Sequence, residues 1–156
     1  MIFFLLNNEI EFNSNAYGKW CLLPYKNHKN GCPNYGKRKT CPPFAKKFEE
    51  LIEPPYFLVL QEFDLDFQKK KMKEKHPNWT DNQCKNLLYW QKGLVKNLKE
   101  EANYYARILG QNYMVLEVPE ANGVNVFKTC KNIGIKLCAN PEKIVKKIMI
   151  IGKSVS

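Results

Sequence analysis

The cysteine-rich segment from Trp20 to Phe44, WCLLPYKNHKNGCPNYGKRKTCPPF, constrains the fold of this chain more than any other stretch. Its prolines and glycines oppose both a continuous helix and a central strand, because proline has no amide donor and fixes φ. The segment carries Cys21, Cys32 and Cys41 together with His28. Three thiols and an imidazole that share a metal would hold such a segment in place without hydrogen-bond ladders. The sequence therefore predicts a metal site here.

The spacing of these ligands does not identify the metal. Ten residues separate Cys21 from Cys32 and eight separate Cys32 from Cys41, so neither pair has the CxxC spacing of a zinc ribbon. Proline directly follows Cys32 and Cys41, as it follows a ligand of some iron–sulfur clusters. Three thiolates with His28 would complete a structural zinc site, whereas three thiolates alone would hold an iron–sulfur cluster with one iron open. Cys138, in the turn-like LCANPE, is the reserve ligand if His28 is not one.

Basic residues surround these cysteines. Between Cys21 and Phe48 there are seven of them and no acidic residue, namely Lys26, Lys29, Lys37, Arg38, Lys39, Lys46 and Lys47. Nearby cations favour the thiolate that a metal requires, and they also bind phosphate groups. RNA or another phosphate-bearing ligand is therefore a predicted partner of residues 26–47, with Trp20, Tyr25 and Tyr35 available to stack on bases. The net charge of +10 alone is equally consistent with a biased base composition.

Length and composition predict a single domain over residues 1–156. A chain of this length buries a conventional core, and its 44% hydrophobic content is too high for disorder. No apolar run approaches the ~20 residues that span a bilayer, so no membrane partner is expected. The opening MIFFLL has no basic residue and precedes Glu9 and Glu11, which argues against a signal peptide. We expect a cytoplasmic protein whose six cysteines are thiols or metal ligands rather than disulfides.

Hydrophobic periodicity predicts the elements around the segment. Strands are expected at 2–6 and 9–12 with a turn at Asn7-Asn8, a helix at 44–52, a strand at 56–63, a lysine-rich helix capped by Asp64 or Asp66 and ending near residue 75, one long helix at about 81–109, a strand at 113–118, a helix at 125–132 and a strand at 144–151. Thr80 and Gln83 form a capping-box signature before the long helix. This mixture, partly in strand–helix–strand order, predicts an α/β or α+β fold with a mixed sheet and packed helices.

The remaining residues indicate no familiar enzyme class. The chain contains no nucleophile elbow, phosphate-binding glycine loop or HExxH motif. Cys84 and Cys130 lie on apolar faces of predicted helices, and buried packing is the expected role of such cysteines. Catalysis at an open metal position stays compatible with the sequence.

Two stretches resemble an uncharacterised, predicted metal-binding family, domain of unknown function 2284. GCPNYGKRKTCPP, residues 31–43, resembles the family signature in which a CPNYG-type motif is followed shortly by CPP. PEANGVNVFKTCKNIG, residues 119–134, resembles the family's late glutamate-alanine-x-glycine element, which precedes a short helix. The resemblance implies that Cys32 and Cys41, and by extension Cys21, are metal ligands. It also marks Glu120, Gly123 and Asn125 as candidates to support the site or contact a substrate or cofactor.

The chain departs from this family in one respect. Members carry a further closely spaced cysteine group between the two stretches, and here only Cys84 lies there, so a second cluster is not expected. The family has no settled activity. Three hypotheses follow: a small cytosolic protein holding zinc or an iron–sulfur cluster, an iron–sulfur enzyme whose open iron supports sulfur or redox chemistry on RNA or a nucleotide, and a basic RNA-binding module stapled by zinc.

Overall fold

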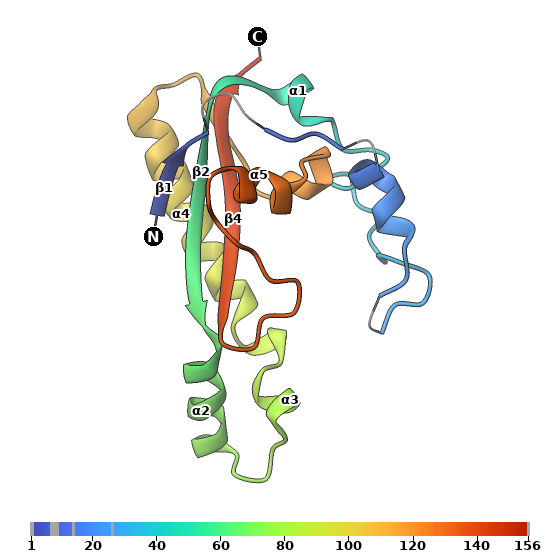
Figure 1. Cartoon of the computed structure of the whole chain (residues 1–156), viewed down its shortest axis with the longest axis vertical. Helices are drawn as coiled ribbons and strands as arrows, with labels where there is room; N and C mark the ends of the chain where they lie inside the picture. Colours follow the sequence, from blue (N-terminus) through green and yellow to red (C-terminus); the bar gives the residue numbers. More distant parts are fainter. Residues whose placement is uncertain (1, 7–9, 14, 26, 156) are drawn as a thin grey trace.

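The structure, a computed structural model, describes residues 2–6, 10–13, 15–25 and 27–155. They form an α+β fold around a four-stranded sheet of order β1-β2-β4-β3 (Figure 1). The strands are β1 (Ile2–Leu5), β2 (Ile52–Asp64), β3 (Tyr113–Leu116) and β4 (Ile144–Ser154). Each neighbouring pair is antiparallel. The predicted mixed sheet is therefore wrong: β2 and β3 share a direction, but β4 lies between them and runs opposite to both.

Helices cover both faces of this sheet. Successive side chains of a strand point to opposite faces. On one face Val59, Met149 and Ile151 pack against α4 (Gln91–Leu109), which contributes Leu98 and Ala102. On the other face the buried residues from the sheet and its covering segments include Leu58, Leu60, Ile148, Ile150, Phe48, Val124, Val126 and Cys130. The covering elements there are α1 (Phe48–Leu51), the 3₁₀ turn η4 (Pro119–Asn122) and α5 (Val126–Asn132).

Two of the predicted helices begin after a capping side chain close to the expected position. Helix α2 (Leu65–Lys75) begins after Asp64, whose carboxylate accepts a hydrogen bond from the backbone N–H of Phe67. Asn125 caps α5 in the same way, at 3.1 Å from the backbone nitrogen of Lys128. The helix expected at 44–52 is reduced to α1, because the chain enters β2 at Ile52 and pairs there with Ser154. Sheet pairing overrides the local helical pattern at this point.

The single long helix predicted for 81–109 is broken. Its first part is α3 (Asp81–Cys84), where Thr80 and Gln83 form the predicted capping box, and a 3₁₀ turn, η3 (Leu87–Tyr89), separates α3 from α4. Trp90 causes the break, because its ring is buried in a stack on Phe63 with centroids 4.8 Å apart. Its indole nitrogen donates to the carbonyl of Lys85 at 3.0 Å, which holds the intervening turn. Tertiary packing of one large side chain decides where the helix begins.

The N-terminal part of the chain differs from the strand pair expected there. Phe12 makes an isolated antiparallel bridge to Val124, and residues 10–13 form no strand. The predicted turn at Asn7-Asn8 lies outside the described residues. No helix in the described part of the chain is both long and apolar enough to cross a membrane.

The cysteine-rich segment, residues 20–44, lies beside the sheet rather than in it. It follows a helical turn, η1 (Asn15–Lys19), starts with a 3₁₀ turn, η2 (Trp20–Leu22), and continues as turns and bends. In Figure 1, α5 and η4 lie between this segment and strands β2 and β4. Those two elements therefore connect the segment to the sheet.

Candidate metal centre

A backbone contact brings Cys21 and Cys32 together. The N–H of Cys32 donates to the carbonyl of Cys21, with nitrogen and oxygen 2.6 Å apart. Gly31 makes this approach possible, since it has a φ of +84° and its Cα faces the backbone of Cys21 and Leu22. A Cβ at this position would lie 2.7 Å from the carbonyl carbon of Leu22. Only glycine accommodates both the left-handed conformation and the close backbone.

A second loop places Cys41 near the same turn. The N–H of Gly36 donates to the carbonyl of Pro42 at 2.9 Å, which closes the loop. Pro42 is fully buried and packs beside Gly18: a Cβ on Gly18 would lie 3.7 Å from Cβ of Pro42. Gly18 is also three residues before Cys21. The residue that follows Cys41 therefore lies against the turn that carries Cys21.

Both of the other cysteines in the segment affect the electrostatics of Cys21. Burial raises the pKa of the Cys21 thiol, and the nearby sulfurs of Cys32 and Cys41 raise it further. Backbone hydrogen bonds from Gly18 and from Cys21 itself act in the opposite direction by favouring the thiolate. Thiolates that repel one another in this way become compatible once a cation lies between them.

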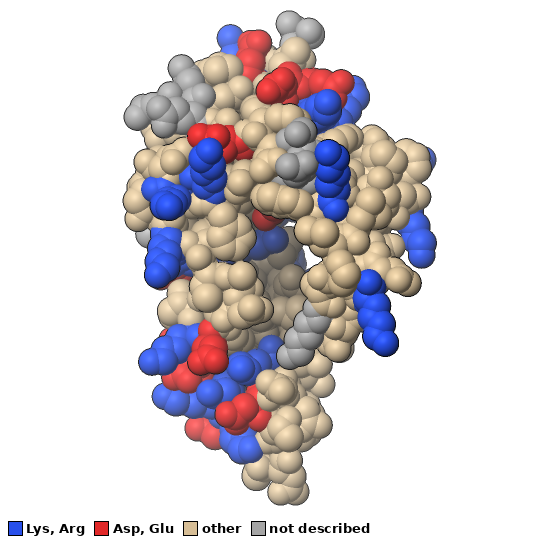
Figure 2. All heavy atoms as spheres, turned by 45° about the vertical axis from the view of Figure 1, so that its right-hand side comes forward, with Lys and Arg blue, Asp and Glu red and all other residues tan. Residues whose placement is uncertain are grey.

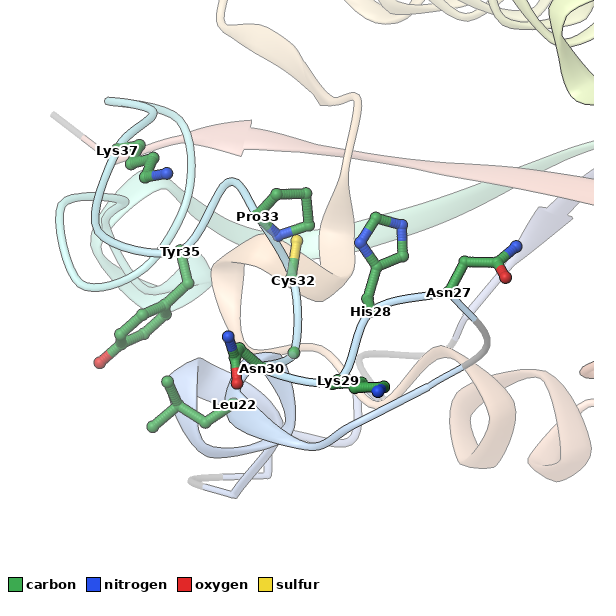
Figure 3. A pocket seen from close by; sticks show the side chains of 10 residues that line it. Leu22, Asn27, His28, Lys29, Asn30, Cys32, Pro33, Tyr35 and Lys37 are labelled. Atoms are coloured by element: carbon green, nitrogen blue, oxygen red, sulfur yellow. The ribbon is translucent and has the colours of Figure 1, made fainter.

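His28 lies next to Cys32 on the same side of the loop. Both line a cavity of about 460 Å³, and Figure 3 shows the imidazole and the thiol directed to the same side, close to Pro33. The ring of His28 packs on Tyr25 with centroids 4.5 Å apart, and the two backbones exchange hydrogen bonds of 2.8 and 3.1 Å. Lys29 and Lys37 also line the cavity. The cavity thus combines a thiol, an imidazole and two cations.

The five predicted metal ligands are not all brought together. Cys138 is exposed in the loop between α5 and β4, and that loop lies beside β4 in Figure 1, apart from the cysteine-rich segment. Among the described residues, no three side chains of His, Cys, Asp or Glu are already arranged to hold a metal ion. Ligation would therefore require the thiols of Cys21, Cys32 and Cys41 to converge from their present positions.

The late stretch at 119–134 packs against residues that precede the cysteine-rich segment, namely Glu11, Phe12 and Tyr17. Gly123 has a φ of +85° and packs against the ring of Phe12 and Cβ of Tyr17. The backbone N–H of Asn125 donates to the carbonyl of Glu11 at 2.7 Å. Both residues thus have structural roles, and Glu120 is exposed. Their predicted contact with a substrate or cofactor stays a prediction.

Two further side chains complete this attachment, and the sequence pattern did not identify either. The hydroxyl of Tyr17 donates to the carbonyls of Pro43 and Ala45, and burial together with Glu50 raises its pKa. The amide of Asn122 donates to the carbonyl of Lys46 at 2.7 Å. The only sequence signal for the role of Tyr17 is its position beside Gly18 in an otherwise polar stretch.

Cys84 and Cys130 are buried, as predicted for core cysteines. Burial, with a smaller contribution from Glu120, raises the pKa of Cys130 from 9.0 to about 12. We expect iodoacetamide at pH 9 to alkylate the exposed Cys138 rapidly and to leave Cys130 intact until denaturant is added, with peptide mass spectrometry as the readout. Alkylation of both thiols at similar rates in the native protein would contradict this.

The same shift has a consequence for stability. A thiol whose folded pKa is raised stabilises the fold fully below its unfolded pKa, and this contribution is lost as the pH rises from 9.0 towards about 12. The free energy of unfolding should therefore fall more steeply with pH above 9.0 in the parent chain than in Cys130→Ala.

The surface around the candidate centre is basic and otherwise mostly uncharged. Figure 2 shows Lys and Arg side chains scattered over this part of the molecule. The chain has no acidic residue from Phe12 to Phe48. This distribution suits an anionic partner of any class, so the predicted binding of RNA stays a prediction.

Searches of protein-family models, of curated proteins and of solved structures each returned no match for this chain. Its resemblance to the predicted metal-binding family through residues 31–43 and 119–134 therefore stays a prediction.

Proposed function

We propose that this chain is a metal-binding protein whose Cys21, Cys32 and Cys41 hold zinc or an iron–sulfur cluster. The observation that supports the proposal is the proximity of the turns that carry these cysteines: a 2.6 Å backbone hydrogen bond joins Cys32 to Cys21, and Cys41 is near enough to raise the pKa of Cys21. They come from three turns that share little regular secondary structure. A bound metal would hold these turns together.

The chain contributes more than sulfur atoms. Backbone hydrogen bonds from Gly18 and Cys21 to the Cys21 thiol favour its thiolate form and orient it. The lysines beside the cavity, Lys29 and Lys37, lower the energy of a negatively charged thiolate site. Three thiolates with an imidazole supply a closed zinc site, whereas three thiolates alone leave one iron of a cluster open to a ligand.

His28 separates the two forms of the centre. It lies beside Cys32 and is the best-placed fourth ligand for zinc, since Cys138 lies apart. In a zinc protein, His28→Ala should weaken metal binding by at least about tenfold. In a three-cysteine cluster protein, the same variant should keep its iron and sulfide. The metal affinity and metal content of His28→Ala therefore distinguish a zinc site from a three-cysteine cluster.

The direct experiment is anaerobic purification followed by a visible spectrum and elemental analysis of iron, zinc and acid-labile sulfide on one sample. A brown protein with matched iron and sulfide would establish the cluster, and a colourless protein with one zinc would establish the structural site. A pure, folded protein with neither metal, which also fails to take up either on reconstitution, would refute the proposal.

Replacing one proposed ligand should abolish stoichiometric metal binding. We expect Cys32→Ala to lose its metal and to unfold at a lower denaturant concentration, because metal binding and folding of this segment are coupled. Elemental analysis and urea denaturation of the purified variant are the measurements.

Two cysteines outside the centre provide the matched controls. Cys84→Ala removes a buried thiol on another part of the fold, and Cys138→Ala removes an exposed one. Both should keep full metal content. Retention of stoichiometric metal by Cys32→Ala would overturn the ligand assignment.

A further inference from the structure

Four large side chains next to the candidate centre are exposed. We define them as the apolar patch: Trp20 is 46% exposed, Leu22 53%, Leu23 56% and Tyr25 52%. They are nearly consecutive, and none of the three residues of η2 is buried. Clusters of exposed apolar residues surrounded by polar ones mark interaction surfaces more often than chance.

The patch is held in place by the fold. The N–H of Leu23 donates to the carbonyl of Trp20 at 3.1 Å, and the N–H of Cys32 donates to the carbonyl of Cys21, which lies between Trp20 and Leu22 in the chain. Leu22 and His28 line the same cavity, and Tyr25 packs on His28, so the patch continues into the wall beside Cys32. A partner bound here would touch the residues on both sides of Cys21. These contacts belong to the polypeptide and do not require a metal.

Charge determines what kind of molecule fits this surface. The described basic residues of this part of the chain are Lys19, Lys29, Lys37, Arg38, Lys39, Lys46 and Lys47, and no acidic residue occurs between Phe12 and Phe48. A second copy of the chain would bring a net charge of +10 against this surface. A partner that carries carboxylates around its own apolar side chains would be attracted to it.

We propose that the apolar patch is a docking site for an acidic protein segment that presents apolar side chains flanked by carboxylates. Leucine makes up half of the patch, and aliphatic side chains bury well against a protein but provide no stacking surface for bases. One face of the Tyr25 ring already contacts His28. These features favour a protein over RNA, and they place the docking site at the rim of the candidate metal centre.

The test uses a displayed library of short random peptides selected against the full-length, anaerobically purified chain at low ionic strength. Enriched peptides should combine Asp or Glu with Leu, Phe or Trp, and their affinity should fall steeply with added salt. The double variant Leu22→Asp, Leu23→Asp should weaken the best peptide by at least about tenfold, because it removes apolar area and adds negative charge. Lys29→Glu should also weaken binding of this peptide.

A matched control comes from η3, far from the patch. Leu88 is 83% exposed there, next to the exposed Leu87, so the double variant Leu87→Asp, Leu88→Asp makes the same chemical change on another surface. It should bind the selected peptide as the parent does. Circular dichroism and thermal unfolding verify that all variants are folded.

Three results would overturn the inference. The first is no enrichment, or enrichment of peptides without carboxylates. The second is equal affinity for the parent chain and for the Leu22→Asp, Leu23→Asp variant. The third is binding of a random single-stranded RNA pool at the same concentration, lost in the same variant, with no peptide selected; the surface would then be a nucleic-acid site. None of these depends on metal content, so the inference and the proposed function fail independently.

Discussion

Gly31→Ala should cost the folded protein about 3 kcal/mol or more in the free energy of unfolding and should abolish stoichiometric metal binding. The added Cβ would collide with the carbonyl oxygen of Cys21 and lie 2.7 and 2.9 Å from two backbone atoms of Leu22. Backbone cannot rotate away as a side chain does, so the turns of Cys21 and Cys32 must separate. Urea denaturation and elemental analysis of the purified variant measure the two effects.

Gly36→Ala is the control that isolates this collision. Gly36 also has a left-handed backbone, with a φ of +70°, but a Cβ there would meet nothing within 4 Å. The variant should therefore lose only the conformational cost of alanine in that region, about 1 kcal/mol. It should also keep its metal. Equal losses of stability at the two positions would show that the contact between Gly31 and the Cys21 turn does not hold the site.

Gly123→Ala should detach the cysteine-rich segment from the sheet. A Cβ at Gly123 would overlap the ring of Phe12 and lie 3.3 Å from Cβ of Tyr17. The ring of Phe12 packs in the core beside Phe48, with centroids 6.0 Å apart, so it has little room to move. We expect a loss of about 2 kcal/mol or more and faster proteolysis within residues 20–44. Denaturation and limited proteolysis with mass spectrometry are the measurements.

The control for this variant is Gly134→Ala. Gly134 has a φ of +82°, close to that of Gly123, and open space where its Cβ would be. Its substitution should leave the proteolysis pattern of the parent chain unchanged, with a loss of only about 1 kcal/mol. If Gly123→Ala shows the same pattern as Gly134→Ala, the contact with Phe12 and Tyr17 does not attach the segment.

Much of the secondary structure could be predicted because it depends on local patterns. The buried runs of β2 and β4, the Asp64 and Asn125 caps and the capping box at Thr80 follow from residues that are close in sequence. The predictions failed where a contact with a distant part of the chain determines where a helix begins or ends. Trp90 breaks the long helix because it packs on Phe63, and α1 ends at Ile52 because β4 pairs with it.

For the candidate site too, some features could be predicted from the sequence and others could not. Composition alone singled out Cys21, Cys32, Cys41 and His28, because few other uses explain three cysteines in a segment that cannot form regular structure. The position of Cys138 in a loop apart from the cysteine-rich segment, and the packing of Gly123 against Phe12 and Tyr17, depend on which loops the fold brings side by side. Spacing along the chain carries no information about such long-range proximity.

The sequence by itself determined which residues are candidate metal ligands, most of the strands and helices, and the basic character of the surface, since each depends on residue identity or on neighbours in the chain. Tertiary structure alone decided the antiparallel order of the sheet, the approach of Cys32 to Cys21 through Gly31, and the exposure of Leu22 and Leu23. Each of these results depends on how separate segments pack or fail to pack on one another, and the free energy of that packing is set only when the whole chain folds.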